Sequence, residues 1–256
     1  MAEFGKYLYC IIPCQEERTF DEAGMCEDGP VHTVCYNGLG AVISDSPMKQ
    51  YESTRKNLMA HERVLERVMR EFTLLPVRFG TVTDSASDIQ DIQELLKSRF
   101  EEFQRLLRDM EGKVELGLKA FWRDEKAIFE EIVAENGDIR RLRNSLLHKS
   151  PEAAHFGRIR LGETVKEALK RKRAEEAAQI LAPLRQINHK IKENEVLADR
   201  MVLNAAFLVD KAREPEFDQA ATRLDEQFGQ RIALKYIGPV PPYNFVNIVV
   251  NWKGPR

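Results

Sequence analysis

Apolar runs and turn residues alternate through the first part of the chain and predict short strands. The run Tyr7–Ile12 (YLYCII) is rich in aromatic and β-branched residues and is closed by Pro13, which is typical of a strand. Two more runs, Val31–Tyr36 and Leu39–Ile43, are separated only by Asn37-Gly38. Because both turn residues tolerate a positive φ, this dipeptide predicts a β-hairpin.

A helical periodicity follows the hairpin. Ser46-Pro47 supplies a candidate N-cap and first turn, and apolar residues then recur every three or four positions, which predicts one buried helix face. These positions are Leu58, His61, Leu65, Val68 and Phe72. Pro76 ends the helix, residues 77–82 (VRFGTV) predict a return strand, and an apolar stripe over Ile92–Met110 predicts another helix.

The second half again alternates strands and helices. Two-residue alternation in residues 113–122 (KVELGLKAFW) predicts a half-buried strand, and the continuous apolar run 201–210 (MVLNAAFLVD) predicts a buried central strand. The charged stretch from 151 to 199 is expected to be mostly helical. Further helices are expected at residues 125–135, 139–148 and 217–228, and two last strands at 231–238 and 243–250, around Pro239, Pro241 and Pro242.

This order of elements predicts an α+β protein of two domains. We expect residues 1–110 to form an N-terminal α+β domain and residues 111–256 to form a C-terminal one. Each half fits a variant of the ferredoxin-like, split β-α-β pattern, and the second carries a helical insertion at about 151–199.

Composition excludes several classes of partner. The chain has 256 residues, of which 43% are hydrophobic and 31% charged, a globular balance. The formal net charge of −2 gives no reason to expect nucleic acid or an anionic membrane as partner. The N-terminal apolar run is too short for a signal peptide, and no run approaches the about 20 residues that span a bilayer. A cytoplasmic protein is expected.

The cysteines are the first candidates for chemistry. They are Cys10, Cys14, Cys26 and Cys35. Their spacing does not match the tight pairs of zinc sites, so ordinary buried or half-buried thiols are expected. The alternative is a cytosolic thiol-dependent enzyme that pairs a cysteine with His32 or His61, although no strained turn or oxyanion loop flanks any of them. No catalytic residue, metal ligand or cofactor is predicted.

Two other local patterns have structural interpretations. HERVLE, at residues 61–66, has Leu65 where the zinc-protease helix motif needs a second histidine, so His61 is predicted to be a packed core residue. KRKR, at residues 170–173, lies among glutamates at helical spacing, which is typical of a solvated helix face. Binding of an acidic partner is the alternative for that segment.

Three stretches together resemble the gas vesicle protein F/L family (GvpF/GvpL). They are the opening YLYCII, LLPVRFGTV at 74–82 after a His-Glu pair, and YIGPVPPYNFV at 236–246, where Val240 replaces the family's tryptophan. The residues that carry the resemblance are Tyr7, Tyr9, His61, Glu62, Pro76, Arg78, Phe79, Gly80, Gly238, Pro239, Pro241, Pro242, Tyr243 and Phe245.

The resemblance implies a two-domain α+β protein without enzymatic activity or cofactor. As partners it implies the main hydrophobic shell protein of the gas vesicle and other accessory proteins, and it implies a location at the vesicle shell within the cytoplasm. We expect the domain of residues 1–110 to make the contact, through an open sheet edge or an apolar groove. The F member is favoured over the L member.

Overall fold

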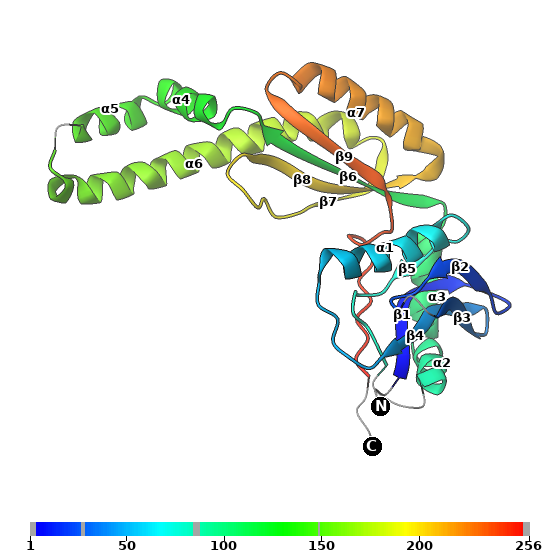
Figure 1. Cartoon of the computed structure of the whole chain (residues 1–256). Coiled ribbons are helices and arrows are strands. Elements are labelled where there is room, and N and C mark those ends of the chain that lie inside the picture. Colours follow the sequence, from blue (N-terminus) through cyan, green and yellow to red (C-terminus); the bar gives the residue numbers. More distant parts are fainter. Residues whose placement is uncertain (1–3, 27–28, 84–87, 148, 253–256) are drawn as a thin grey trace. The chain divides into compact units, whose positions relative to one another are not determined.

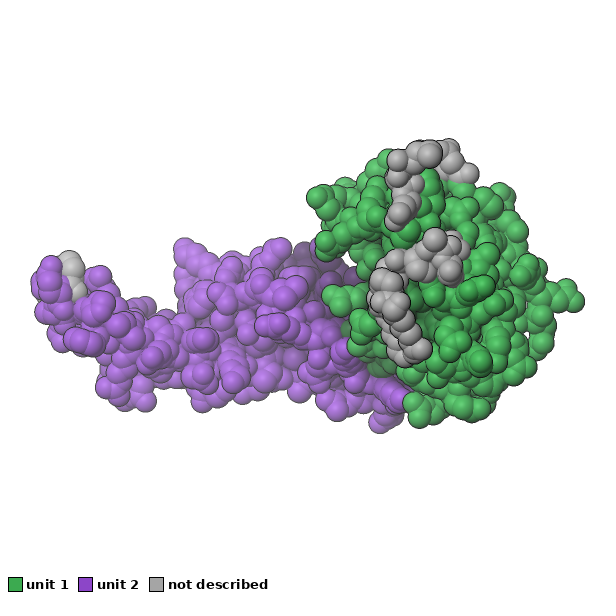
Figure 2. All heavy atoms as spheres, turned by 90° about the horizontal axis from the view of Figure 1, so that it is seen from below, with its two compact units in different colours: residues 1–115, 239–256 green, residues 116–238 purple. Residues whose placement is uncertain are grey.

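The computed structural model divides the chain into two compact units. It describes residues 4–26, 29–83, 88–147 and 149–252. Unit 1 comprises residues 1–115 and 239–256, and unit 2 comprises residues 116–238 (Figure 2). The sequence placed all residues after 110 in one domain, whereas the structure groups the last stretch, from Pro239, with unit 1. In the described part of the chain, no helix is long and apolar enough to cross a membrane.

Unit 1 is built on a five-stranded antiparallel sheet of order β2-β3-β4-β1-β5 (Figure 1). Its elements are β1 (Phe4–Pro13), β2 (Thr19–Ala23), β3 (Pro30–Tyr36), β4 (Leu39–Pro47), α1 (Arg55–Met69), β5 (Leu75–Pro76), α2 (Asp88–Ser98) and α3 (Phe100–Met110). Four strands precede the first helix, so the split β-α-β order predicted for this half is not the order found.

The β3–β4 hairpin confirms the turn prediction. Asn37 has φ 48° and Gly38 has φ 87°, the left-handed conformations that a two-residue hairpin turn needs. The predicted helix start at Ser46-Pro47 is wrong, because β4 continues through Pro47 as the partner of Phe4 in β1. Helix α1 begins at Arg55 instead, where the Thr54 side chain accepts a hydrogen bond from the Asn57 backbone N–H.

Helices cover both faces of this sheet. Tyr7 and Tyr9 in β1 lie in one core cluster with Val64 and Leu65 of α1, while Leu8, between the two tyrosines, is also fully buried. Since successive strand residues point to opposite faces, both faces are shielded from water. Helix α1 contacts β1 and β2, and α2 and α3 contact β1 and β4.

Unit 2 is built on a four-stranded sheet of order β7-β8-β6-β9 (Figure 1). Its elements are β6 (Lys113–Trp122), α4 (Glu125–Glu135), α5 (Gly137–Leu146), α6 (Pro151–Leu184), β7 (Asn188–Glu193), β8 (Met201–Asp210), a 3-10 turn (Lys211–Arg213), α7 (Glu214–Phe228) and β9 (Ile232–Val240). Helices α6 and α7 contact each other, and α6 contacts β8. The ring centroids of Phe217 in α7 and Phe207 in β8 are 5.0 Å apart. Both helices therefore pack on one face of the sheet.

Two predictions for the second half are corrected. The stretch 151–199, expected to be mostly helical, is helical as far as Leu184, one residue after Pro183, but its remainder contains an edge strand, β7, that was not expected. Residues 243–250 do not form the expected last strand: Tyr243–Phe245 is a turn, and only Ile248 makes a β-bridge, with Val77. The strand before the prolines is present as β9 and extends through Pro239.

Candidate functional site

Four family-motif residues of the N-terminal half meet in one aromatic cluster in the core of unit 1. Tyr7 and Tyr9 come from β1, His61 from α1, and Phe79 from the loop after β5. Ring centroids are 4.8 Å apart for Tyr7–Tyr9, 5.7 Å for Tyr9–His61 and 5.6 Å for His61–Phe79. Tyr7 and Tyr9 are 0% exposed and His61 is 3% exposed. The predicted core role of His61 is thereby confirmed.

A chain of hydrogen bonds through Tyr7 fixes three elements. The Gly80 backbone N–H donates to the Tyr7 hydroxyl oxygen at 2.8 Å, which leaves the hydroxyl proton for His61 Nδ1 at 3.1 Å. Burial lowers the pKa of His61 to about 4, so the imidazole is neutral at pH 7 and Nδ1 can accept. Gly80, at φ 81°, turns its amide toward the cluster without the cost that a side chain would bring.

The other tyrosines of the cluster are likewise held as protonated hydrogen-bonding groups. Tyr9 Oη receives the Met25 backbone N–H at 2.7 Å and lies 2.9 Å from Ser44 Oγ. Tyr51 Oη lies 2.8 Å from Ser46 Oγ. Burial raises the pKa of both tyrosines to about 12. At neutral pH these tyrosines are therefore protonated and the His61 imidazole is neutral, so the groups hydrogen-bond inside the core without a buried charge.

Neither Cys10 nor Cys35 has the lowered pKa of an activated thiol. Burial raises the pKa of Cys10, and burial followed by contact with Cys14 raises the pKa of Cys35 to about 11. A catalytic thiol needs the opposite shift. Among the described residues, no hydrogen bond joins a cysteine to a histidine, and no group of three metal-ligating side chains is found. The geometry gives no support to the thiol-enzyme alternative.

The proline-rich motif marks the crossing of the chain from unit 2 back to unit 1. The boundary lies after Gly238, which has φ 135°. Pro241 and Pro242 then open a turn in which the Tyr243 N–H donates to the Pro241 carbonyl at 2.7 Å and the Phe245 N–H to the Pro242 carbonyl at 3.1 Å. We call residues 239–252 the C-terminal strap.

The C-terminal strap is anchored on unit 1 by polar contacts. Asn244 donates its backbone N–H and its side-chain Nδ2 to Glu115, at 2.8 and 2.6 Å. The Arg78 backbone N–H donates to the Ile248 carbonyl at 3.2 Å. The Tyr243 hydroxyl donates to the Glu62 carboxylate, whose pKa burial raises. The strap thus joins the motif residues near both chain ends, which sequence reasoning did not foresee.

An exposed apolar surface lies where the strap meets α1. Leu58 is 38% exposed, Met59 50% and Tyr243 36%. Leu58 and Met59 stand four and three residues before Glu62, so they share its helix face beside the Tyr243 contact. We call Leu58, Met59, Glu62 and Tyr243 the α1 patch. The sequence had placed Leu58 in the buried stripe, which in fact begins at Ala60 and His61.

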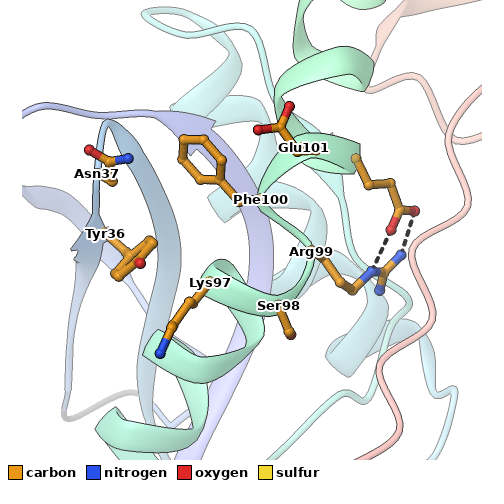
Figure 3. Close-up of a pocket in the computed structure, with 8 residues that line it drawn as sticks. Tyr36, Asn37, Lys97, Ser98, Arg99, Phe100 and Glu101 are labelled. Atoms are coloured by element: carbon orange, nitrogen blue, oxygen red, sulfur yellow. Dashed lines mark hydrogen bonds and ion pairs between the residues drawn. The ribbon is translucent and has the colours of Figure 1, made fainter.

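A separate pocket of about 510 Å³ lies in unit 1 between the β3–β4 turn and the α2–α3 junction (Figure 3). Tyr36 of β3 and Phe100 of α3 meet edge to face at 6.3 Å across it. The Arg99 guanidinium at its rim is held by Glu102 through two bonds of 2.8 Å. The Ser98 hydroxyl, also in the lining, donates to the Leu95 carbonyl of α2 at 3.2 Å.

The predicted basic segment of α6 is tied to its own unit. Lys172 Nζ lies 3.0 Å from both Glu131 and Glu135 of α4, rather than pairing along its own helix. Arg231 adds two bonds of 2.7 Å to Glu131 and holds Glu176 at 2.8 Å. The hydrogen bonds that Glu131 accepts, chiefly from Arg231 and also from Lys172, lower its pKa to about 2. The network leaves little reason to assign Lys172 to an acidic partner.

The fold and the motif residues together define the structural class of the protein. The chain is an α+β protein of two antiparallel sheets whose motif residues build a core and an anchored strap. A family model described as "Gas vesicle synthesis protein GvpL/GvpF" matches residues 5–247, so the chain belongs to that family.

Individual relatives agree with the family model. Gas vesicle protein F of Microcystis aeruginosa (strain PCC 7806) is 28% identical over 250 residues, covering 96% of this chain and 99% of the relative, and that of Dolichospermum flosaquae is 29% identical over 247 residues, covering 94% and 97%. The crystal structure of GvpF from Anabaena sp. PCC7120 matches 97% of this chain and 100% of its own, with a TM-score of 0.80 and 27% identity. The GvpF structure from Microcystis aeruginosa gives 0.78 at 27% identity, covering 94% and 98%. These relatives all bear the name of the F member, as predicted.

Proposed function

We propose that the chain is a non-enzymatic accessory or minor structural protein of gas vesicle assembly that binds the main hydrophobic shell protein. Membership of the GvpL/GvpF family supports a role in the vesicle. Burial raises the pKa of Cys10 and of Cys35, the opposite of the shift that a catalytic thiol needs, which favours the binding role over a thiol enzyme built on either residue. Other gas vesicle proteins are further candidate partners, and the gas vesicle shell in the cytoplasm is the proposed location.

The physical need for such a protein follows from the shell protein's own surface. A shell subunit with an apolar face and open strand edges is prone to aggregate before it assembles. A partner that covers this surface for a time would prevent aggregation and present the subunit for nucleation. Binding of this kind needs apolar contact area on a rigid scaffold, with few charges at its centre.

The observation that carries the proposal is the α1 patch on unit 1. Leu58 and Met59 are exposed on a helix whose opposite face is packed into the core, so the patch is rigidly supported. Methionine adapts its shape to apolar partners, and tyrosine provides area at low entropic cost. The proposal therefore keeps the contact in the domain of residues 1–110, which the sequence favoured, and adds Tyr243 of the strap. We also infer that unit 2, with strand order β7-β8-β6-β9, is a ferredoxin-like variant.

Co-precipitation of the purified shell protein with the full-length chain tests the proposal. The variant Leu58→Glu/Met59→Glu places two charges in the α1 patch and should weaken binding by at least about tenfold, which corresponds to about 1.4 kcal/mol. Both positions are exposed, so the fold is expected to persist, which circular dichroism checks.

A matched control puts the same two charges on unit 2. Phe156 and Ile159 in α6 are 83% and 49% exposed, and Phe156→Glu/Ile159→Glu should leave shell-protein binding unchanged. If the control abolishes binding while the α1 variant retains it, the contact belongs to unit 2. If neither variant binds less than the unaltered chain, the α1 patch is not the contact.

A further inference from the structure

Unit 2 has a groove along the outer edge of its sheet that the proposed function does not use. A cavity of about 480 Å³ lies between α7 and the edge strand β9. Its apolar floor is formed by Leu118 of β6 with Leu234 and Tyr236 of β9. Its wall is one face of α7, where the lining residues recur at helical spacing: Asp218, Ala221, Thr222, Asp225 and Glu226.

The strand beside this groove has an edge open for pairing. β9 is the last strand of the sheet order, and among the described residues β6 is its only strand neighbour. Tyr236 and Ile237 are 39% and 42% exposed there. The opposite edge strand, β7, instead exposes charged residues such as Lys190 and Glu193, which discourage edge pairing. Of the two edges of this sheet, the described part of β9 therefore presents exposed apolar side chains, Tyr236 and Ile237, next to one exposed lysine, Lys235.

The groove is preformed. The Tyr236 ring stacks on Phe217 of α7 with centroids 5.8 Å apart, and its hydroxyl donates to Asp218 at 2.6 Å. Burial, and then this bond, raise the pKa of Tyr236, so its hydroxyl stays protonated and able to donate to Asp218. Ala221 and Thr222, the small residues of the wall, leave room for side chains of an occupant.

The charge of the lining selects the occupant. Asp218, Asp225 and Glu226 are all exposed, and the residues that line the cavity include no lysine or arginine. Asp218 is engaged by Tyr236, which leaves Asp225 and Glu226 facing the open groove. An occupant with basic side chains would complement them, whereas an acidic one would be repelled.

We propose that this groove binds an extended, basic segment of a partner protein, which pairs with β9 as an added strand. Main-chain hydrogen bonds to the β9 edge supply affinity, apolar side chains on one face fill the floor over Leu118 and Leu234, and a lysine or arginine meets Asp225 and Glu226. The proposal concerns unit 2 alone and does not depend on the α1 patch.

Three synthetic peptides test it on the full-length chain. The first is a short peptide that alternates lysine and valine, the second replaces its lysines by glutamate, and the third replaces its central valines by proline, which cannot donate to a strand ladder. The first peptide should bind and shift the backbone amide resonances of β9. The other two should bind at least about tenfold more weakly, a difference of about 1.4 kcal/mol.

Charge exchange on the protein sharpens the test. Asp225→Lys/Glu226→Lys alters exposed positions near the C-terminal end of α7, where lysine suits the helix dipole, so folding is expected to persist. This variant should lose the lysine peptide and gain the glutamate peptide. Glu163→Lys/Glu167→Lys, two exposed positions on α6, makes the same change in net charge and should bind as the unaltered chain does.

Several outcomes overturn the proposal. The proposal is wrong if the lysine peptide fails to bind, or if that peptide shifts only resonances that lie outside β9 and α7. It is also wrong if the proline peptide binds as tightly as the lysine peptide. If the α7 and α6 lysine variants lost affinity for the lysine peptide equally, the effect would be one of net charge and the proposal would be wrong. Analytical ultracentrifugation of the chain alone tests whether a second copy of the chain occupies the groove. Self-association that Asp225→Lys/Glu226→Lys abolishes would assign the groove to a second copy and overturn the proposal.

Discussion

Acidification should reveal the energetic cost of protonating His61 in the aromatic cluster. Burial lowers the pKa of this imidazole from 6.5 to about 4. In the unfolded chain the group takes up its proton first, so the stability of the neutral, buried form is complete above about pH 6.5 and is lost as the pH falls toward 4. At about 1.4 kcal/mol for each pKa unit, the loss attributable to His61 is about 3 kcal/mol.

Urea unfolding of the full chain at a series of pH values measures this loss. Near-ultraviolet circular dichroism of the tyrosine cluster follows unit 1, which matters because a chain of two units need not unfold in one step. The variant His61→Gln keeps a polar partner for Tyr7 but does not titrate, so subtraction of its curve cancels Glu62 and the other carboxylates. The unaltered chain should lose about 3 kcal/mol more than the variant on acidification. Parallel curves would refute the reasoning.

Two further predictions concern buried polar contacts of unit 1. Tyr7→Phe removes the partner of both the Gly80 N–H and His61 Nδ1, so the free energy of unfolding should fall by about 2–4 kcal/mol, as measured by urea unfolding; a loss below about 0.5 kcal/mol, typical of surface positions, would contradict it. Glu115→Ala removes the acceptor of both Asn244 donors, so hydrogen exchange in the C-terminal strap should quicken by about tenfold or more while exchange in unit 2 is unchanged; unchanged exchange in the strap would show that Glu115 does not anchor it.

Local signals were sufficient where the local interaction also decides the structure. Asn37-Gly38 predicted the hairpin because the φ angles of the turn are set by the turn residues themselves. Periodicity predicted three buried positions of α1, His61, Leu65 and Val68, but it also included Leu58, which is exposed, and Phe72, which lies beyond the end of the helix at Met69. The boundary of that stripe depends on which strands lie beneath the helix, and the sequence of one helix does not contain that information.

Local signals failed where distant residues decide. The sequence of residues 243–250 alternates as a strand does. Contacts with the distant residues Glu115, Glu62 and Arg78 hold this segment on unit 1 without making it a strand of the sheet. The strand β7 (NHKIKE) reads as a continuation of a polar helix, and it is extended because it pairs with β8. Pairing of this kind overrides weak local preference.

The candidate surfaces depended even more on the three-dimensional arrangement. The α1 patch needs the strap to bring Tyr243 to α1, and the groove in unit 2 combines β6, α7 and β9, which are far apart in sequence. From the sequence alone, Asp225 and Glu226 belong to a solvated helix face. The family motif, by contrast, was visible at once, because its residues build the core cluster and the strap that the fold requires.

The central claim, that unit 1 contacts the shell protein through the α1 patch, is tested most directly by site-specific photo-crosslinking. A photoreactive amino acid placed at Met59, which is 50% exposed, would report what lies against the patch in cells that form gas vesicles. The same group at Ile159, which is 49% exposed on unit 2, is the matched control. The account predicts a crosslink to the shell protein from position 59 and none from position 159, and a crosslink from position 159 alone would contradict it.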